Sequence, residues 1–457
     1  MEIGRDMRDR MTAGLVGAGL ALLPAVAWGQ AFTDPLVPVP PIPVAPSIPA
    51  TAPAGQFLPL GQSVTARPRP EYDPLGIRAG DFFFFPRLET DLAYDDNIFA
   101  TKSNTTGDFL AVERPGIDMR SNLPQNAINF SAGAALSQYF NHSNFNSNDG
   151  FGDLNGRLDV DNQHYATAEL RAEKTHIDIG APEVPGNAAE PLRYNDYSAI
   201  LGFDQYRLRI GYEITGTVRR EEFQATPLVG GGFTFNSNLN NFAYEGAVRP
   251  YYEFQPGYQG YIRFAYNKRD YDHAAGNGIP TLSSSGYRGD VGARINLTGV
   301  TYIDAFVGYL QQNYEANSFG SIGGVDFGAN LVWNATQLTS VSFKSGRTVE
   351  DINNAVLTGA AAQNSPGYLE TTAAVIVDHE LLRNVLLNGT LAYTNDNFQN
   401  ISRVDNSYGA GVGVKYLFNR YLYLGANYTF QHVDSTGTSA MTPFTRNIIL
   451  LRLSTQL

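Results

Sequence analysis

The segment from Tyr408 to Phe430 shows a pattern that recurs along most of this chain. Apolar residues occupy every second position from 410 to 418 and again from 422 to 430, with mainly small or polar residues between them. A period of two predicts β-strands, because successive side chains point to opposite faces of a sheet. The apolar faces of the two arms match only if Phe418 pairs with Leu422. We therefore predict a hairpin with residues 419–421 as its loop.

The same alternation continues from Phe82 to the C-terminus and predicts about eighteen strands, with sixteen as the alternative count. The predicted strands span residues 82–96, 109–121, 126–140, 151–161, 164–178, 194–203, 206–222, 241–254, 258–271, 286–297, 301–315, 322–333, 336–349, 367–380, 384–397, 405–418, 422–434 and 443–457. Long polar links alternate with short turns between them, which is typical of barrels in the bacterial outer membrane. An even strand number places the N- and C-termini together on the short-turn side, which we expect to face the periplasm.

A soluble β-sandwich also alternates, so strand length and aromatic placement must separate the two architectures. Strands of soluble sheets usually have about five or six residues, whereas most of the predicted strands reach the length of about ten that crosses a bilayer at a tilt. Aromatic residues also cluster beside the short turns, as an interfacial girdle would: Tyr165, Tyr206, Tyr258, Tyr302, Phe418, Tyr421 and Tyr423. We predict an all-β fold, a transmembrane antiparallel up-and-down β-barrel.

Barrels of about sixteen to eighteen strands enclose an aqueous channel. Charged residues within the strands should face this channel, because a Lys or Arg facing lipid at the bilayer centre costs about 2–4 kcal/mol. The residues predicted to line the pore are Glu169, Arg171, Glu173, Arg207, Arg209, Glu213, Arg263, Arg288, Asp290, Arg294, Asp304 and Lys415. Two interpretations stay open: these charges pair across neighbouring strands, or they create a field that selects the solute.

The first 75 residues lack the strand pattern and predict two segments before the barrel. Residues 1–29 contain three arginines, an apolar stretch from Met11 to Ala27 and small residues around a cleavage site, which together indicate a secretory signal peptide. Residues 30–75 are proline-rich, and proline neither continues a helix nor pairs within a sheet. We expect a disordered or extended periplasmic segment, either a tether or a docking ligand for a periplasmic partner or the cell wall. The barrel is assigned to residues 76–457.

Composition narrows the possible classes of function. Charged residues make up only 17%, Gly, Tyr and Phe number 46, 26 and 27, and the mean hydropathy is −0.22. This combination favours a barrel over a helical membrane protein. The absence of cysteine excludes disulfides and thiolate metal sites. The net charge of −12 argues against nucleic acid as a partner.

Residues suited to catalysis are sparse. Among six histidines, His176 with Asp178 and His432 with Asp434 place an acid beside a histidine near predicted loops. No serine motif accompanies either pair. We therefore predict no enzymatic activity, no catalytic residue, no cofactor and no metal site.

Two local features stand out in the first predicted hairpin. The Asp95–Asn97 cluster fits local turn hydrogen bonds at a strand end, with a bound cation as the alternative. Pro115-Gly116 shifts the apolar alternation from Leu110 and Val112 to Ile117 and Met119, which predicts a β-bulge.

The region 76–121 carries a further set of features: Gly76, the Gly80–Pro86 run, the Tyr94–Ile98 run, Asp108 and Pro115-Gly116. In these features it resembles the opening of the putative β-barrel porin 2 family of Gram-negative outer-membrane proteins. The resemblance implies an outer-membrane barrel over residues 76–457. Some members of that family stand beside exopolysaccharide or capsule export systems and are considered to supply the outer-membrane pore.

On this resemblance we expect an outer-membrane pore for exopolysaccharide or capsular polysaccharide export. Its expected partners are outer-membrane lipids and lipopolysaccharide, periplasmic components of polysaccharide export, and a hydrophilic solute or polysaccharide. A general diffusion porin for small hydrophilic solutes is the first alternative, and a plugged structural or adhesive barrel is the second.

Overall fold

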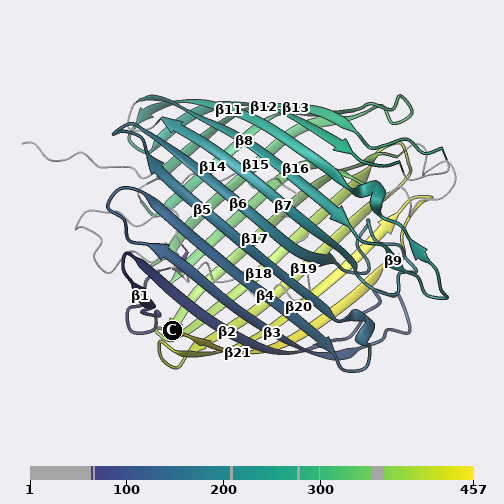
Figure 1. Ribbon diagram of the computed structural model, residues 1–457, viewed down its shortest axis with the longest axis horizontal. Helices are drawn as coiled ribbons and strands as arrows, with labels where there is room; N and C mark the ends of the chain where they lie inside the picture. The colour runs from purple at the N-terminus through teal and green to yellow at the C-terminus, as the bar shows by residue number, and fades with distance from the viewer. Residues whose placement is uncertain (1–62, 65–66, 206–208, 275–277, 298, 353–364) are drawn as a thin grey trace, which may run out of the picture.

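The computed structural model describes residues 63–64, 67–205, 209–274, 278–297, 299–352 and 365–457. Eighteen long strands in this part of the chain form one antiparallel barrel (Figure 1). They are β2 Phe82–Asp95, β3 Asp108–Ser121, β4 Ala127–Tyr139, β5 Ser147–Asp159, β6 His164–Ile177, β7 Leu192–Gln205, β8 Ile210–Phe223, β11 Asn241–Gln255, β12 Tyr258–Tyr271, β13 Ser284–Leu297, β14 Thr301–Tyr314, β15 Ser321–Thr336, β16 Thr339–Asp351, β17 Gly367–Leu382, β18 Val385–Phe398, β19 Val404–Leu417, β20 Leu422–Thr436 and β21 Phe444–Gln456.

Every strand of the barrel pairs with the next along the chain, and β2 also pairs with β21. The closing ladder runs from Asp95 opposite Ile448 to Arg87 opposite Gln456. Closure gives backbone groups partners that a bilayer does not provide. The predicted antiparallel barrel of eighteen strands is confirmed. Among the described residues, no helix has the length and apolar character needed to cross a membrane.

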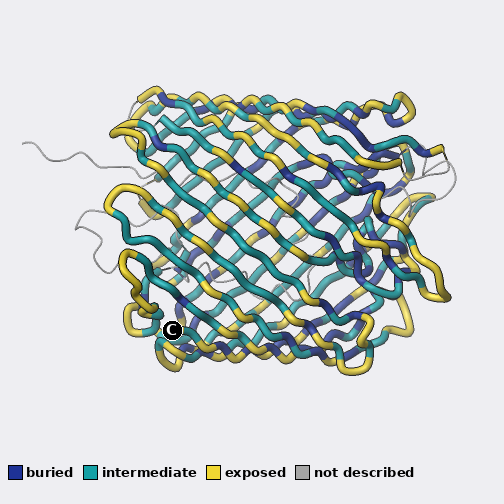
Figure 2. The backbone as a smooth tube through the Cα atoms, viewed as in Figure 1, coloured by how far each residue is buried: buried dark blue, intermediate teal, exposed yellow. Residues whose placement is uncertain are grey.

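The alternation of side chains separates an apolar outer surface from a mainly polar interior. In β21, Ile449, Leu451 and Leu453 are about half exposed, whereas the alternate residues Arg452 and Ser454 are buried. Exposed positions recur in the same way along the other strands (Figure 2). The short turns and the C-terminus lie at one end, the turn end, and the long loops lie at the other, the loop end (Figure 1).

The β19–β20 hairpin has the predicted three-residue loop. Phe418 N–H donates to the Leu422 carbonyl at 3.1 Å, and the strand register continues from this pair to Leu417 opposite Tyr423. Asn419 Oδ1 accepts the N–H groups of Tyr421 and Leu422 at 2.8 and 3.0 Å. The asparagine side chain thus closes the turn, and both arms keep their apolar rows on the outside.

The β-bulge predicted at Pro115-Gly116 is wrong. β3 pairs with β2 in one unbroken register from Asp108 to Ser121. Leu110 and Val112 instead face the interior, where they are fully buried. They form a small apolar cluster with Ala93, Ile448 and Leu450. Near the loop end the barrel interior is packed rather than aqueous, so apolar residues can occupy inward positions there.

Two predicted turns lie further along the chain than expected. Residues 204–205 belong to β7, and residues 334–335 belong to β15, whose turn to β16 falls at residues 337–338. A polar residue near a strand end can face the barrel interior or belong to the turn. The sequence pattern therefore leaves the boundary between strand and turn ambiguous.

The predicted aromatic girdle is only partly correct. Phe418 and Tyr421 are about half exposed beside their turn, as expected. Tyr165 and Tyr423 are buried, and Tyr423 donates to interior Glu89 at 2.5 Å. A tyrosine near a turn therefore faces lipid or the lumen according to its strand register, and proximity to the turn does not decide which.

Residues 63–64 and 67–73 lie against the interior of the turn end before β1 (Ile77–Ala79) pairs with β2. Val64 N–H donates to Ser340 Oγ at 2.7 Å. Buried Arg69 forms an ion pair with Glu380 of β17 at 2.8 Å. The signal peptide predicted at residues 1–29, and most of the proline-rich segment, lie outside the described residues.

Candidate functional site

The long loops pack on one another across the loop end and bury an apolar cluster. The larger loop residues of this cluster, called the loop cap, are Ile98, Phe145, Ile179, Val184, Leu239, Ile279, Leu282 and Phe319. Short 3-10 turns at η2 (Ser143–Phe145) and η3 (Ser237–Leu239) carry two of them. Burial of this apolar surface stabilises the loops over the mouth of the barrel.

The loop of residues 178–191 crosses the lumen. It connects β6 and β7, yet the hydroxyl of Tyr368 on β17 donates to Glu183 Oε1 in this loop at 2.6 Å. β17 lies on the opposite side of the barrel from β6 and β7 in the strand order. Burial raises the pKa of the Glu183 carboxyl.

A second loop braces loop 178–191 from outside. Residues 224–240 form a small hairpin of β9 (Thr226–Pro227) and β10 (Phe233–Thr234). Ala189 N–H donates to the Pro227 carbonyl at 2.9 Å, and Val229 N–H donates to the Asn187 carbonyl at 2.9 Å. The two loops therefore share backbone hydrogen bonds and should move together.

A cavity of about 610 Å³ lies in the barrel interior, between β8, β11–β17 and loop 178–191. One part of its wall is rich in arginine. Arg263 is held by Asp290 at 2.8 Å, Arg294 by Asp304 at 3.0 Å, and Arg249 by Glu213. These ion pairs link neighbouring or nearby strands and fix the guanidinium groups in the wall.

Aromatic rings lie beneath these guanidinium groups. The Arg263 guanidinium is 4.3 Å from the centre of the Phe306 ring, and that of Arg249 is 4.9 Å from the Tyr261 ring. Each stacked pair combines a flat apolar face with hydrogen-bond donors.

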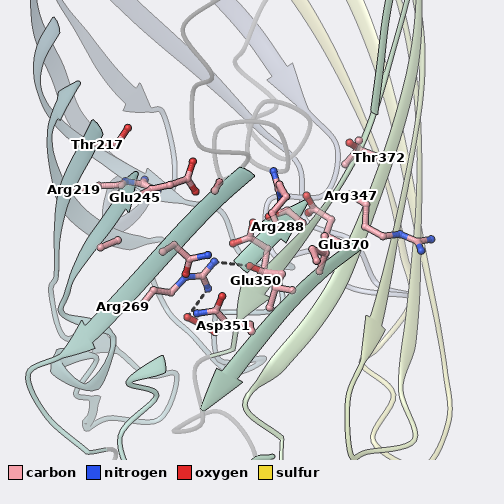
Figure 3. A pocket seen from close by; sticks show the side chains of 18 of the residues that line it. Thr217, Arg219, Glu245, Arg269, Arg288, Arg347, Glu350, Asp351, Glu370 and Thr372 are labelled. Carbon is pink, nitrogen blue, oxygen red and sulfur yellow. Dashed lines mark hydrogen bonds and ion pairs between the residues drawn. The ribbon is translucent and has the colours of Figure 1, made fainter. Parts of the chain in front are cut away.

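Another part of the wall is acidic. Glu350 of β16 and Glu370 of β17 line the cavity (Figure 3), as does Glu183. Asp396 of β18 lies close to them. Within the described chain, Glu350 Oε1 and Asp396 Oδ1 are buried without a hydrogen-bond partner. The cavity wall thus has an arginine-rich part on β11–β14 and an acidic part on β16 and β17.

Most of the predicted pore residues lie inside the barrel. Arg263, Arg288, Arg294 and Asp304 line the cavity. Asp290 and Glu213 support it through the ion pairs described above, and Arg288 pairs with Asp326 at 2.8 Å.

The other predicted pore residues lie away from the cavity. On β6, Arg171 pairs with Glu173 at 2.8 Å, and Glu169 shares their side of the strand. Lys415 Nζ lies 3.6 Å from the Tyr423 ring near the turn end. Arg209 is exposed in the turn before β8, because β7 extends to Gln205 and β8 begins only at Ile210. Arg207 lies outside the described residues.

Several cavity residues were missed from the sequence: Glu183, Arg219, Arg249, Arg269, Lys344, Glu350, Asp351 and Glu370. Strand alternation could have found Arg219, Arg249, Arg269, Lys344, Glu350 and Glu370, which sit at inward positions. No local pattern marks Glu183, because its place depends on a loop crossing the barrel.

The Asp95–Asn97 cluster makes local hydrogen bonds of the predicted kind. Asn97 N–H donates to Asp95 Oδ1 at 2.8 Å, and Asn97 Nδ2 donates to the Thr101 carbonyl at 2.8 Å. Asp95 also pairs with Arg446 at 3.0 Å. Among the described residues, no group of three or more His, Cys, Asp or Glu is arranged to hold a metal ion.

The two histidine–aspartate pairs have different surroundings. His176 contacts Asp149 at 2.9 Å and Asp178 at 3.5 Å. His432 Nδ1 lies 2.9 Å from Thr445 Oγ1.

Comparison with solved structures finds matches of low similarity that cover most of this chain. The unliganded ferric citrate transporter FecA is 10% identical, with 84% of this chain and 79% of that chain covered and a TM-score of 0.42. OpdL of Pseudomonas aeruginosa is 10% identical, with 83% and 100% covered and a TM-score of 0.42. OccK2 (OpdF) of the same organism, solved with glucuronate, is 10% identical, with 82% and 98% covered and a TM-score of 0.42. No curated protein matches the chain.

A closed eighteen-stranded barrel with an apolar outer surface and charged interior rows is an outer-membrane β-barrel of the porin class. More narrowly, the chain belongs to the putative beta-barrel porin 2 family, which matches residues 69–457. The family suspected from residues 76–121 is confirmed. Family and fold indicate a transport channel rather than an enzyme.

Proposed function

We propose that this barrel is an outer-membrane channel for a hydrophilic solute and that the described conformation is its closed state. The charged cavity of about 610 Å³ beneath the loop cap carries this proposal. Ionised side chains facing a closed interior are costly unless they are paired and hydrated or meet a polar solute. A purely structural barrel would gain nothing from so many charged groups around one cavity.

Exported exopolysaccharide or capsular polysaccharide is the leading solute. The family resemblance suggests it, and the stacked pairs at Phe306 and Tyr261 support it. Sugar rings have an apolar face and a hydroxyl rim, and an aromatic ring bordered by guanidinium donors complements both. Passage of a polymer requires the loop cap and loop 178–191 to withdraw from the lumen.

A diffusion channel for small hydrophilic solutes is the second candidate. The cavity volume favours it, because pockets for single small molecules span about 300–1,000 Å³. In this case the opposed charges at Arg263 and Glu370 would orient a charged or strongly polar solute as it passes.

Planar-bilayer recording of the refolded full-length mature chain tests the channel. Discrete conductance steps support it, whereas zero conductance, even after removal of loop 178–191, would favour a plugged structural barrel. Deletion of the gene then separates the solutes. Loss of surface polysaccharide with unchanged small-solute uptake supports export, and the reverse result supports a diffusion channel.

We further propose that the turn end, with both termini, faces the periplasm, where residues 30–62 can reach export components. Lipopolysaccharide and lipid then surround the outer face. The cysteine-free chain allows a direct test with single cysteines at Gly231 in the β9–β10 hairpin and Arg420 in a short turn. A membrane-impermeant maleimide should label intact cells only at Gly231→Cys, and labelling only at Arg420→Cys would reverse the orientation.

A further inference from the structure

The barrel wall has an incomplete seam between β15 and β16. Their ladder covers residues 328–336 of β15 and 339–346 of β16. Beyond it, β15 stays paired with β14 up to Ser321, and β16 stays paired with β17 up to Asp351. Residues 321–327 and 347–351 thus reach the loop end as two neighbouring strand edges that are not joined.

The loop end of β16 lies inside the lumen. Asp351 shares its side of the strand with Val341 and Phe343, which lie on the outer face of the barrel lower down. Yet interior residues of β12 and β14 surround the Asp351 carboxylate. Arg269 Nη1 lies 2.7 Å from it, and the hydroxyls of Tyr271 and Tyr314 donate to it at 2.6 and 2.5 Å; Arg269 also donates to the Val349 carbonyl at 2.8 Å.

Apolar contacts also place the outer side of β16 and β17 inside the barrel. Val349, on the outer side of β16, is buried in the same cluster as interior Leu310 and Ile322. On β17, Leu369 packs against this cluster. A Cβ on Gly324 of β15, which would point inward, would lie 3.6 Å from the Leu369 side chain. The outer face of β16–β17 therefore packs against the inner face of β15.

Arg347 stands where β16 leaves the wall. Its guanidinium donates to the Val325 carbonyl of β15 at 3.3 Å and to Thr371 Oγ1 of β17 at 2.9 Å, and it lies 4.8 Å from the Phe327 ring. Figure 3 shows Arg347 pointing away from the group formed by Arg269, Glu350 and Asp351. Arg347 thus bridges the seam from outside while Asp351 is held inside.

We propose that the loop-end halves of β16 and β17, residues 347–351 and 367–371, are a gate with two positions. In the closed position they are rolled into the lumen, as described here. In the open position they lie in the wall, and β16 continues its ladder with β15. The gate deepens the proposed channel function and rests on it.

In the open position, the free strand edges gain backbone hydrogen-bond partners and the outward side chains face lipid. Continuing the β15–β16 register places Val349 opposite Val325, so that the edge of residues 321–327 gains backbone partners. Val349 and Leu369 then face lipid, as their place in the alternation predicts. The same movement draws Tyr368 away from Glu183 and so releases loop 178–191 from β17.

Disulfide trapping tests the gate, because the native chain has no cysteine to interfere. The refolded, reduced double variant Val325→Cys/Val349→Cys is oxidised in a bilayer, and crosslinking is measured by mass spectrometry after thiol blocking. The matched control is Ala329→Cys/Ser345→Cys, a directly opposed pair in the formed part of the same ladder. Oxidation should crosslink both variants, but only the first should raise the conductance, and reduction should reverse the rise.

The outcomes separate the gate from the channel. Crosslinking of the control without crosslinking of the 325/349 pair overturns the two-position gate. Crosslinking of the 325/349 pair with unchanged conductance overturns its role in gating, although the strand movement would stand. Absence of conductance in every variant and redox state overturns the channel function itself, since crosslinking does not depend on solute passage.

Asp351→Asn provides a second variant that introduces no new bond. It removes the charge that Arg269 and the two tyrosines hold, so the ratio of open to closed time should rise roughly tenfold, as loss of a hydrogen bond to a charged group predicts. Asp270→Asn, which removes an exposed ion pair with Lys268, should leave the ratio unchanged. Equal ratios in the two variants would overturn the closed-state latch.

Discussion

Truncation of Phe319 offers a direct test of whether the loop cap closes the barrel. Phe319 lies in the loop between β14 and β15 and has no exposed surface. Its ring packs edge-on against Tyr314, with 6.0 Å between ring centres. Its carbonyl accepts a hydrogen bond from Asn400 Nδ2 of another loop at 2.9 Å. Phe319→Ala therefore removes apolar contact from the centre of the cap and leaves the backbone bonds intact.

The size of the effect follows from this burial. Replacement of a fully buried phenylalanine by alanine costs about 3–5 kcal/mol, through lost transfer energy and the cavity left behind. If the cap opens as a local unit, this cost raises its opening constant by about a hundredfold to several thousandfold. The barrel strands should be unaffected, because no lipid-facing contact changes.

Hydrogen exchange in lipid nanodiscs measures the opening constant. Amides of residues 315–320 and of loop 96–107 should lose protection by the same factor, since both loops contribute to one apolar cluster. In planar bilayers the variant should also conduct for a larger share of the time. Amides in the middle of β14 serve as an internal reference.

Phe235→Ala is the matched control, because Phe235 lies in a loop of the same end but is 74% exposed. It should change neither exchange nor conductance. Equal protection in the two variants would show that the buried cluster does not hold the loops together, and the description of the loop end as a closed cap would fail.

Three further predictions concern single charged groups. Burial raises the pKa of Glu183, so protonation of this carboxyl as the pH falls through the raised pKa removes the cost of burying a charge. Loop 178–191 should then dock more tightly, and the conductance should fall. Glu183→Gln keeps an acceptor for Tyr368 and should abolish this pH dependence. Asp91→Asn should lower the free energy of unfolding in urea by about 3–5 kcal/mol, because Asp91 is buried and receives two 2.7 Å bonds from Arg452. Arg69→Ala should expose the segment before β1 to added protease at the turn end, since it breaks a buried 2.8 Å ion pair.

Each of these predictions has a control and a contrary result. Conductance that rises as pH falls would contradict the expected tighter docking of protonated Glu183. The charged or titratable groups around Glu183 are Tyr368, Arg403, Asp405, Glu350, Glu370 and Asp396. Asp270→Asn should change the free energy of unfolding by less than about 1 kcal/mol, because the pair of Asp270 with Lys268 is exposed. A loss of stability in Asp91→Asn no larger than that in Asp270→Asn would count against a stabilising buried network at Asp91. Arg78→Ala, at an exposed position, should leave proteolysis unchanged, and cleavage equal to that of Arg69→Ala would mean that the segment is not anchored.

Much of the barrel could be read from local patterns. The strand assignments follow the structure to within a few residues for most strands, because alternation is a property of neighbouring residues. The β19–β20 loop was predicted correctly from face matching at Phe418 and Leu422 alone. Inward charges such as Arg263 and Arg294 were also predicted, since a bilayer penalises the opposite orientation.

Other features depend on residues far apart in the chain. The Arg446–Asp95 and Arg452–Asp91 ion pairs join the last strand to the first, and only closure of the barrel brings them together. The roll of Val349 into the lumen contradicts its outward place in the alternation. Glu183 reaches Tyr368 only because loop 178–191 crosses the barrel.

The residue pattern alone specifies the strands, their two faces and the division into long loops and short turns. These follow from the periodicity of side chains along a strand and from the requirement that lipid meets apolar surface. Packing between distant segments decides that the loops close the mouth, that arginine-rich and acidic groups line one cavity, and that β16 leaves the wall beside β15. Such contacts arise from the curvature of a closed sheet, which brings together residues that no local pattern relates.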